Sequence, residues 1–169
     1  MNKAALDASS KARFGPLKEG QPVPLPLHSM PLVHVIRRER FSAAHRMGRP
    51  DWDQEKNSAV FGKCANPHGH GHNYVLWVTV KGQPDAETSY VVDLGVLSAV
   101  IKEHVVDQLD HRNLDIEVPW LKGKVTSTET LTMAIWDRLL GPVRALGVEL
   151  HCIRVEETEN NHVEYHGEL

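Results

Sequence analysis

A short histidine-rich segment carries the clearest chemistry in this 169-residue chain. His70 and His72 are separated only by Gly71, and they begin a run of alternating residues that predicts a β-strand. Side chains two positions apart on a strand point to the same side, about 6.5–7 Å apart along it. Because neutral imidazole is the commonest metal ligand in proteins, the two rings are expected to converge on one ion, with Gly71 leaving room between them.

A third nitrogen is available from His45, near the end of the preceding predicted strand. Three imidazoles with an open fourth position are typical of a catalytic zinc site, whereas structural zinc sites are closed by four protein ligands. We expect zinc in preference to iron or copper. The alternative interpretation is a surface histidine cluster without metal, since the chain has 11 histidines in all.

Cys64 precedes His70 by six positions and has three interpretations. It could be a fourth zinc ligand that closes the site, a reactive thiol that acts as a base beside the metal, or a buried inert cysteine. We assign the inert role to Cys152. Two cysteines do not make a disulfide scaffold, so a reduced, cytoplasmic protein is expected.

Four further acidic or basic residues are candidates for the same chemistry. The carboxylate of Asp110 can fix the tautomer of the adjacent His111 imidazole and favour its protonated form, although such pairs also occur as solvated caps. Glu129 fits a capping box with Thr126 as the N-cap, so a role in binding is an alternative. Glu157 lies on an apolar strand, among Ile153, Val155 and Thr158, where a carboxylate is unfavourable unless a ligand or partner pairs it. Its two oxygens suit the adjacent N–H and NH₂ donors of a pterin or guanine edge.

These residues are positioned by elements that hydrophobic periodicity predicts. The predicted order is ββααββ, an α+β domain with an antiparallel sheet and both helices on one face. Apolar residues alternate on both faces of the second strand, so both faces are covered or one lines a barrel. The expected strands are 32–46, 70–82, 149–158 and 162–167, with a short extended piece at 90–92. The expected helices are 93–109 and one that runs from Thr126 or Ser127 to the Gly141-Pro142 pair. Polar loops are expected at 48–63 and 110–123.

The bulk composition indicates one ordinary globular domain. Residues 1–31 are rich in proline and glycine and predict a flexible, extended tail, and residues 32–169 form the domain. A net charge of −3 without a basic stripe argues against nucleic-acid binding. No apolar run approaches the roughly 20 residues of a membrane span.

Five segments, in order, resemble the 6-pyruvoyl-tetrahydropterin synthase family. They are Phe41-Ser42-Ala43-Ala44-His45-Arg46; Phe61-Gly62-Lys63-Cys64 with Gly69-His70-Gly71-His72-Asn73-Tyr74; Leu109-Asp110-His111-Arg112-Asn113-Leu114-Asp115; Thr126-Ser127-Thr128-Glu129; and Glu157-Thr158-Glu159-Asn160-Asn161. The resemblance covers roughly residues 33–168. It implies the tunnelling fold (T-fold), in which three sheets close into a barrel and two trimers stack into a homo-hexamer.

The same resemblance implies a role for each candidate residue. His45, His70 and His72 would bind zinc, and Cys64 would accept a proton. Asp110 and His111 would form a relay contributed by a neighbouring subunit. Glu157 would anchor the pterin ring with the assistance of Glu129.

The implied reaction is that of a carbon–oxygen lyase acting on phosphates. Zinc-dependent conversion of 7,8-dihydroneopterin triphosphate to 6-pyruvoyl-tetrahydropterin, with elimination of triphosphate, serves tetrahydrobiopterin biosynthesis. The related 6-carboxytetrahydropterin synthases of queuosine biosynthesis use the same substrate. Their shorter cysteine-to-histidine spacing would make His68 and His70 the ligands and leave His72 in the strand. A cyclohydrolase or epimerase on the same fold and a non-catalytic zinc-binding module are further alternatives.

Overall fold

The computed structural model describes residues 31–168, so the tail expected over residues 1–31 lies almost entirely outside the described residues. A five-stranded sheet organises this part of the chain, in the order β3-β1-β2-β4-β5. Its strands are β1 (Val33–His45), β2 (His70–Gly82), β3 (Arg112–Asn113), β4 (Glu149–Thr158) and β5 (Asn161–Tyr165). All neighbouring pairs are antiparallel except β1 and β3, which run parallel.

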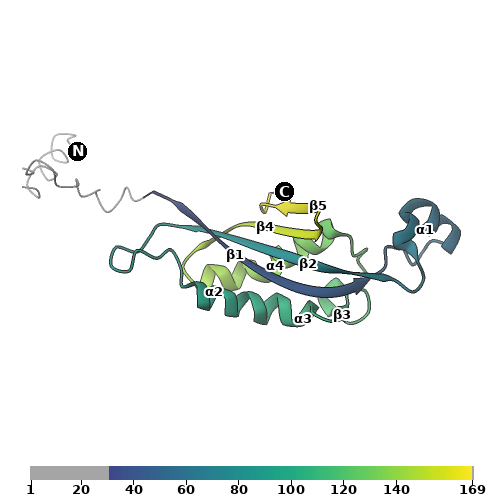
Figure 1. Ribbon diagram of the computed structural model, residues 1–169, viewed down its shortest axis with the longest axis horizontal. Coiled ribbons are helices and arrows are strands. Elements are labelled where there is room, and N and C mark those ends of the chain that lie inside the picture. Colours follow the sequence, from purple (N-terminus) through teal and green to yellow (C-terminus); the bar gives the residue numbers. More distant parts are fainter. Residues whose placement is uncertain (1–30, 169) are drawn as a thin grey trace, which may run out of the picture. The chain divides into compact units, whose positions relative to one another are not determined.

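The helices α2 (Leu94–Ile101), α3 (Asp107–Leu109) and α4 (Thr128–Ala145) lie on one face of this sheet, and α1 (Gln54–Phe61) lies beyond the end of β1 and β2 (Figure 1). α2 starts at Asp93, whose carboxylate caps the first turn, and continues through a π-helical stretch η2 (Lys102–Val106) into α3. α4 packs beside it against β4 and β5, and the 3₁₀ turn η3 (Pro119–Leu121) lies between them in sequence. The α+β class and the predicted order of these elements are confirmed. None of the helices described for residues 31–168 is long and apolar enough to cross a membrane.

The core lies between the sheet and the helices. Leu76, Val78 and Val80 on β2 are fully buried and face α2 and α4, whose apolar stripes include Leu97, Ile101, Leu131, Ile135 and Leu139. On the opposite face of β2, Val75 is buried, and Trp77 and Thr79 are half-buried. The face of the sheet away from the helices is therefore also partly apolar, as the alternation in the sequence predicts.

The segment expected to be a polar loop at 48–63 contains a helix instead. α1 (Gln54–Phe61) begins after Asp53, whose side chain accepts a hydrogen bond from the Lys56 backbone N–H, and the 3₁₀ turn η1 (Gly62–Ala65) follows it. The buried amide of Asn57 donates to three backbone carbonyls, those of Arg49, Trp52 and Asp53. This helix is therefore held by capping and by one buried side chain, and it has no apolar stripe that periodicity could detect.

Other expected boundaries also differ. Ser127, not Thr126, caps α4, because its hydroxyl accepts from the Thr130 backbone N–H. The helix continues past Pro142 to Ala145. The proline removes only one backbone hydrogen bond, in the last turn, and burial of the neighbouring Val143 side chain offsets that loss. Residues 90–92 form no strand, the loop at 110–123 contains β3 and η3, and the hairpin turn lies at Glu159 and Asn160.

Candidate metal centre and adjoining pockets

The β1–β2 ladder brings the three histidines together. His45 lies directly opposite His70, and Ala43 lies opposite His72, so the three imidazoles share the helix-facing side of the sheet. Gly71 suits this crossing, because a Cβ there would lie 3.1 Å from the Ala43 carbonyl oxygen, closer than most Cβ contacts. Gly69 has a φ of +71° and turns the chain into β2 where a Cβ would press on the His45 carbonyl.

The geometry of the three rings fits a metal ion. One nitrogen from each of His45, His70 and His72 lies within 4.8 Å of the other two. The Nε2 atoms of His45 and His70 are 3.1 Å apart, close to the roughly 3.3 Å between two nitrogens on a tetrahedral zinc ion. The buried Nε2 of His72 has no hydrogen-bond partner among the described residues. A cation at this point would satisfy it.

The surroundings favour imidazoles that are neutral and correctly oriented. The Nδ1 of His45, 2% exposed, lies 2.7 Å from the backbone carbonyl of Thr126, so Nδ1 carries the proton and Nε2 presents its lone pair to the centre. Burial lowers the pKa of His70 and of His72, which keeps their lone pairs free at neutral pH. The cluster can therefore hold a metal ion.

Cys64 lies beside this centre rather than in it. It is exposed on η1 and lines a pocket of about 460 Å³ together with His45, Glu129 and Glu157. It is not among the atoms that lie within ligand distance of one another. Cys64 is therefore not one of the grouped donors, and the three-histidine cluster borders the pocket through His45.

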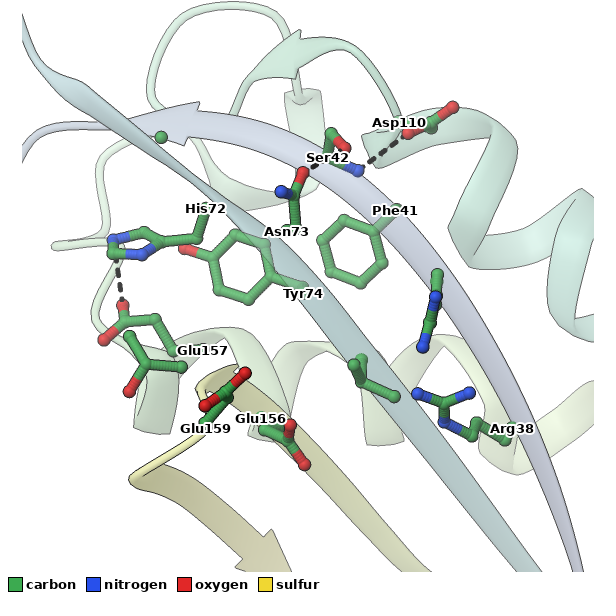
Figure 2. Close-up of a pocket in the computed structure, with 14 residues that line it drawn as sticks. Arg38, Phe41, Ser42, His72, Asn73, Tyr74, Asp110, Glu156, Glu157 and Glu159 are labelled. Carbon is green, nitrogen blue, oxygen red and sulfur yellow. Dashed lines mark hydrogen bonds and ion pairs between the residues drawn. The ribbon is translucent and has the colours of Figure 1, made fainter.

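Glu157 reaches the centre from β4, where alternation places it on the same face of the sheet as Ile153 and Val155. The pairing of β4 with β5 shifts register between Glu156 and Thr158, so Glu157 has no partner in the ladder. Its Oε1 lies 3.6 Å from His72 Nε2 and 3.7 Å from His45 Nε2, and it accepts a 3.0 Å hydrogen bond from the Thr128 hydroxyl. The carboxylate therefore lies beside His72, as Figure 2 shows, and it also contacts Thr128 in the first turn of α4.

A second, larger hollow adjoins the first. It has a volume of about 980 Å³ and is lined by residues that include His72, Tyr74, Asp110 and Glu157. Tyr74 is 1% exposed, its ring stacks on Phe41, and its buried hydroxyl has no partner among the described residues. Sequence analysis missed this residue and Thr128 as components of the site. The Asn73-Tyr74 pair after the histidines was the available signal for Tyr74.

Asp110 and His111 are hydrogen-bonded to the backbone of Ser42 on β1. Asp110 Oδ1 accepts a 2.7 Å hydrogen bond from the Ser42 backbone N–H, and Oδ2 lies 2.9 Å from His111 Nδ1. The bond from Ser42, together with the proximity of His111, lowers the pKa of Asp110. His111 has a φ of +59° and its side chain is 83% exposed. It lines a hollow with Ser42, Gly71 and Asn73, and Cys64 does not line that hollow.

The remaining candidate residues are also placed. Glu129 lies at the second position of α4, and a hydrogen bond with the Ser127 side chain lowers the pKa of its carboxyl group. Because Ser127 is the N-cap, the predicted capping box with Thr126 as the N-cap is wrong. The Thr126 hydroxyl instead donates to Asp115. His68 is exposed, and it lines a different pocket with Arg46 and Lys124. The structure therefore groups His70 and His72, rather than His68 and His70, with His45.

Comparisons with known proteins agree on one family. The model of the family described as 6-pyruvoyl tetrahydropterin synthase matches residues 34–168. The human 6-pyruvoyl tetrahydrobiopterin synthase is 45% identical over 136 residues, covering 80% of this chain and 92% of the human protein. The enzyme of the same name from Dictyostelium discoideum is 43% identical, covering 80% and 97%.

Two further similarities bear on fold and on product. The solved structure of Caenorhabditis elegans 6-pyruvoyl tetrahydropterin synthase superposes with a TM-score of 0.76 at 35% identity, covering 82% of this chain and 98% of that one. A protein from Halobacterium salinarum described as a probable 6-carboxy-5,6,7,8-tetrahydropterin synthase is 39% identical, over only 48% of this chain and 44% of its own length.

Proposed function

Because the chain belongs to the 6-pyruvoyl tetrahydropterin synthase family of lyases, we propose that it converts 7,8-dihydroneopterin triphosphate to 6-pyruvoyl-tetrahydropterin with release of triphosphate. The observation that carries the proposal is the open three-histidine centre, with Cys64 and Glu157 lining one pocket beside it. The pyruvoyl product is favoured because 43–45% identity to synthases of that type extends over 80% of the chain.

We assign the metal as zinc, held by His45, His70 and His72. When bound, zinc would supply Lewis acidity that polarises the side-chain oxygens of the substrate and acidifies the adjacent C–H bonds. Three neutral nitrogens and an open position are the ligand set for that role. The donor atoms and the buried, unpartnered Nε2 of His72 support this assignment.

The protein's own groups would move the protons. Cys64 Sγ, as the thiolate, takes the proton from the side-chain carbon next to the carbon that bears the phosphate ester. The C–H electron pair forms a carbon–carbon double bond as the C–O bond to triphosphate breaks, and the resulting enol tautomerises to the first ketone. The carbinol carbon next to the ring then loses its proton, the electron pair forms a double bond to the ring carbon, and the ring C=N bond is protonated at nitrogen. Loss of the hydroxyl proton and protonation of that ring carbon give the second ketone and the tetrahydropterin ring, so oxidation of the side chain balances reduction of the ring. His111, held by Asp110 Oδ2, takes and returns protons during this tautomerisation.

Glu157 would orient the pterin. Its Oε2 is free to accept from the ring N–H and NH₂ groups while Thr128 donates to Oε1. Glu129 lines the same pocket, within reach of a ligand held there. These two carboxylates bind and position the substrate, and neither is assigned a proton-transfer step.

Assembly completes the site in this proposal. Cys64 and His111 line different hollows of one chain, which supports contribution of the Asp110–His111 pair by a neighbouring subunit in a homo-hexamer of two trimers. Mixing the inactive Cys64→Ala and His111→Ala proteins under subunit exchange tests this. About one site in four would regain both residues and activity if they come from different chains. Activity that stays absent after exchange contradicts shared sites.

The direct test of function is incubation of the zinc-loaded protein with 7,8-dihydroneopterin triphosphate, followed by mass identification of products. We expect 6-pyruvoyl-tetrahydropterin and triphosphate in equal amounts. A 6-carboxy product would place the chain with the queuosine enzymes, to which the partial Halobacterium match points. Unreacted substrate with zinc retained would indicate a non-catalytic zinc module.

A further inference from the structure

A second group of metal-binding side chains lies well away from the three histidines. Cys152 on β4 pairs with Thr79 on β2, seven residues along the strand from His72, or about 23 Å. Thr79 and His72 point to opposite faces of the sheet because their numbers differ in parity. This group therefore lies on the face away from the helices and shares nothing with the candidate active site.

The β4–β5 register brings three ligand types together. Ile153 pairs with Tyr165, so Cys152 and His166 face each other one position further along the hairpin. Glu164 is two residues before His166 and shares its face. One donor atom from each of Cys152, Glu164 and His166 lies within 4.8 Å of the other two. The proximity of these three side chains therefore follows from the pairing of β4 with β5, and not only from the rotamers that the side chains adopt.

The two carboxylate oxygens of Glu164 face different neighbours, Arg154 and His166. Arg154 lies 3.6 Å from Oε1 of Glu164, and Oε2 lies 3.8 Å from His166 Nε2. The His151 ring is 5.6 Å from that of His166, and on its other side it stacks on His34 at 4.2 Å. His151 therefore borders the group without being one of its three grouped donors.

We propose that Cys152, Glu164 and His166 form a second site for a divalent metal ion of the zinc class. Thiolate, imidazole and carboxylate are all zinc ligands, and ligand atoms on a tetrahedral ion lie about 3.3–3.8 Å apart. Closing the present spacing requires movements of about 1 Å, which the exposed side chains of Glu164 and His166 permit. Cys152 is 7% exposed and would supply a fixed anchor.

The site would fasten β5, the last strand of the sheet, to β4. Burial raises the pKa of the Cys152 thiol, so the metal would displace a proton when it binds. Because an ion that binds only the folded protein stabilises it by mass action, occupancy would raise the melting temperature. This role is independent of the proposed catalysis, so either proposal can fail without the other.

Metal stoichiometry and cobalt spectroscopy test the proposal. We expect two equivalents of Zn²⁺ per chain in the full-length protein, and one equivalent in His166→Ala, Glu164→Gln or His72→Ala. With Co²⁺, a near-ultraviolet thiolate-to-cobalt charge-transfer band should appear, persist in Cys64→Ala and vanish in Cys152→Ala. His104→Ala, a histidine outside both clusters, is the matched control and should keep two equivalents.

Three outcomes would overturn the second site. One is a single equivalent in the unaltered protein; another is unchanged stoichiometry in both His166→Ala and Glu164→Gln. The third is a charge-transfer band that disappears in Cys64→Ala and not in Cys152→Ala, which would make Cys64 the thiolate ligand. Since Glu164 and His166 are exposed, their variants are expected to fold even if Cys152→Ala does not.

Discussion

Thr128 and Glu157 are joined by a 3.0 Å hydrogen bond that links the first turn of α4 to the irregular end of β4. The hydroxyl donates to one carboxylate oxygen and leaves the other oriented for a ligand. This bond connects the helix layer to the sheet at the candidate substrate site. It therefore predicts that Thr128 positions Glu157 without contacting the reacting atoms.

Thr128→Val should weaken substrate binding. Loss of a hydrogen bond from a neutral hydroxyl to a charged carboxylate costs about 1.5–3 kcal/mol, so KM should rise about 10- to 150-fold with a smaller change in kcat. Glu157→Gln removes the carboxylate itself and should have a larger effect. Thr130→Val in the same turn is the control, since the Thr130 side chain does not contact Glu157. Equal kinetics for the two threonine variants would contradict the positioning role.

The assignment of His72, and not His68, as a metal ligand predicts different metal contents for variants of these two residues. His72→Ala should lower zinc affinity by more than about 100-fold, because removal of a ligand costs more than removal of an outer partner. His68→Ala, an exposed residue of another pocket, should keep full metal content. Elemental analysis of the purified variants after dialysis measures both. Loss of active-site metal in His68→Ala with retention in His72→Ala would reverse the assignment.

Cys64 is predicted to act on the substrate and not on the metal. Cys64→Ala should bind zinc at the three-histidine centre as the unaltered protein does, while turnover falls by about 10²- to 10⁴-fold, the usual contribution of a positioned base. Metal content and steady-state rate, measured on the same sample, separate the two roles. A variant that loses this metal would make Cys64 the fourth ligand of a closed site.

The metal-free protein should be destabilised by acid through His70 and His72. Burial lowers the pKa of both below the ordinary 6.5, so the folded state binds fewer protons than the unfolded state. This contribution to the unfolding free energy is constant above about pH 6.5 and falls as pH drops through the lowered pKa values. Urea unfolding of chelator-treated protein measures it. The slope of the unfolding free energy against pH should be smaller in the double variant His70→Ala/His72→Ala. An equal slope would show that these two histidines are not the cause of the acid destabilisation.

Tyr74→Phe tests the buried hydroxyl that lacks a partner among the described residues. A buried, unsatisfied polar group costs about 1–3 kcal/mol. The metal-free variant should therefore unfold at equal or higher urea concentration than the unaltered protein, because the ring still packs against Phe41. If a hydroxyl partner forms only with ligand bound, the variant should lose this advantage when substrate analogue is added. A less stable metal-free variant would contradict the prediction.

Periodicity and short-range spacing were sufficient to predict the main strands, both long helices and the approach of His45 to the histidine pair. These features depend on which residues share a face, and alternation encodes that directly. α1 could not be found this way, since its stability comes from the Asp53 cap and the three carbonyls that Asn57 binds. The contacts of Thr126 and Thr128 with Asp115 and Glu157 span 11 and 29 residues and depend on tertiary packing.

The alternation along β4 that brings Glu157 to the histidine-bearing face has a consequence for how such proteins diverge. Side chains on a regular strand change sides when one residue is deleted, so removing a residue between Ile153 and Glu157 would present a different side chain to the metal. Specificity in this scaffold can therefore change by a single-codon deletion as readily as by substitution. Relatives whose β4 differs in length at this point are expected to accept a different heterocycle.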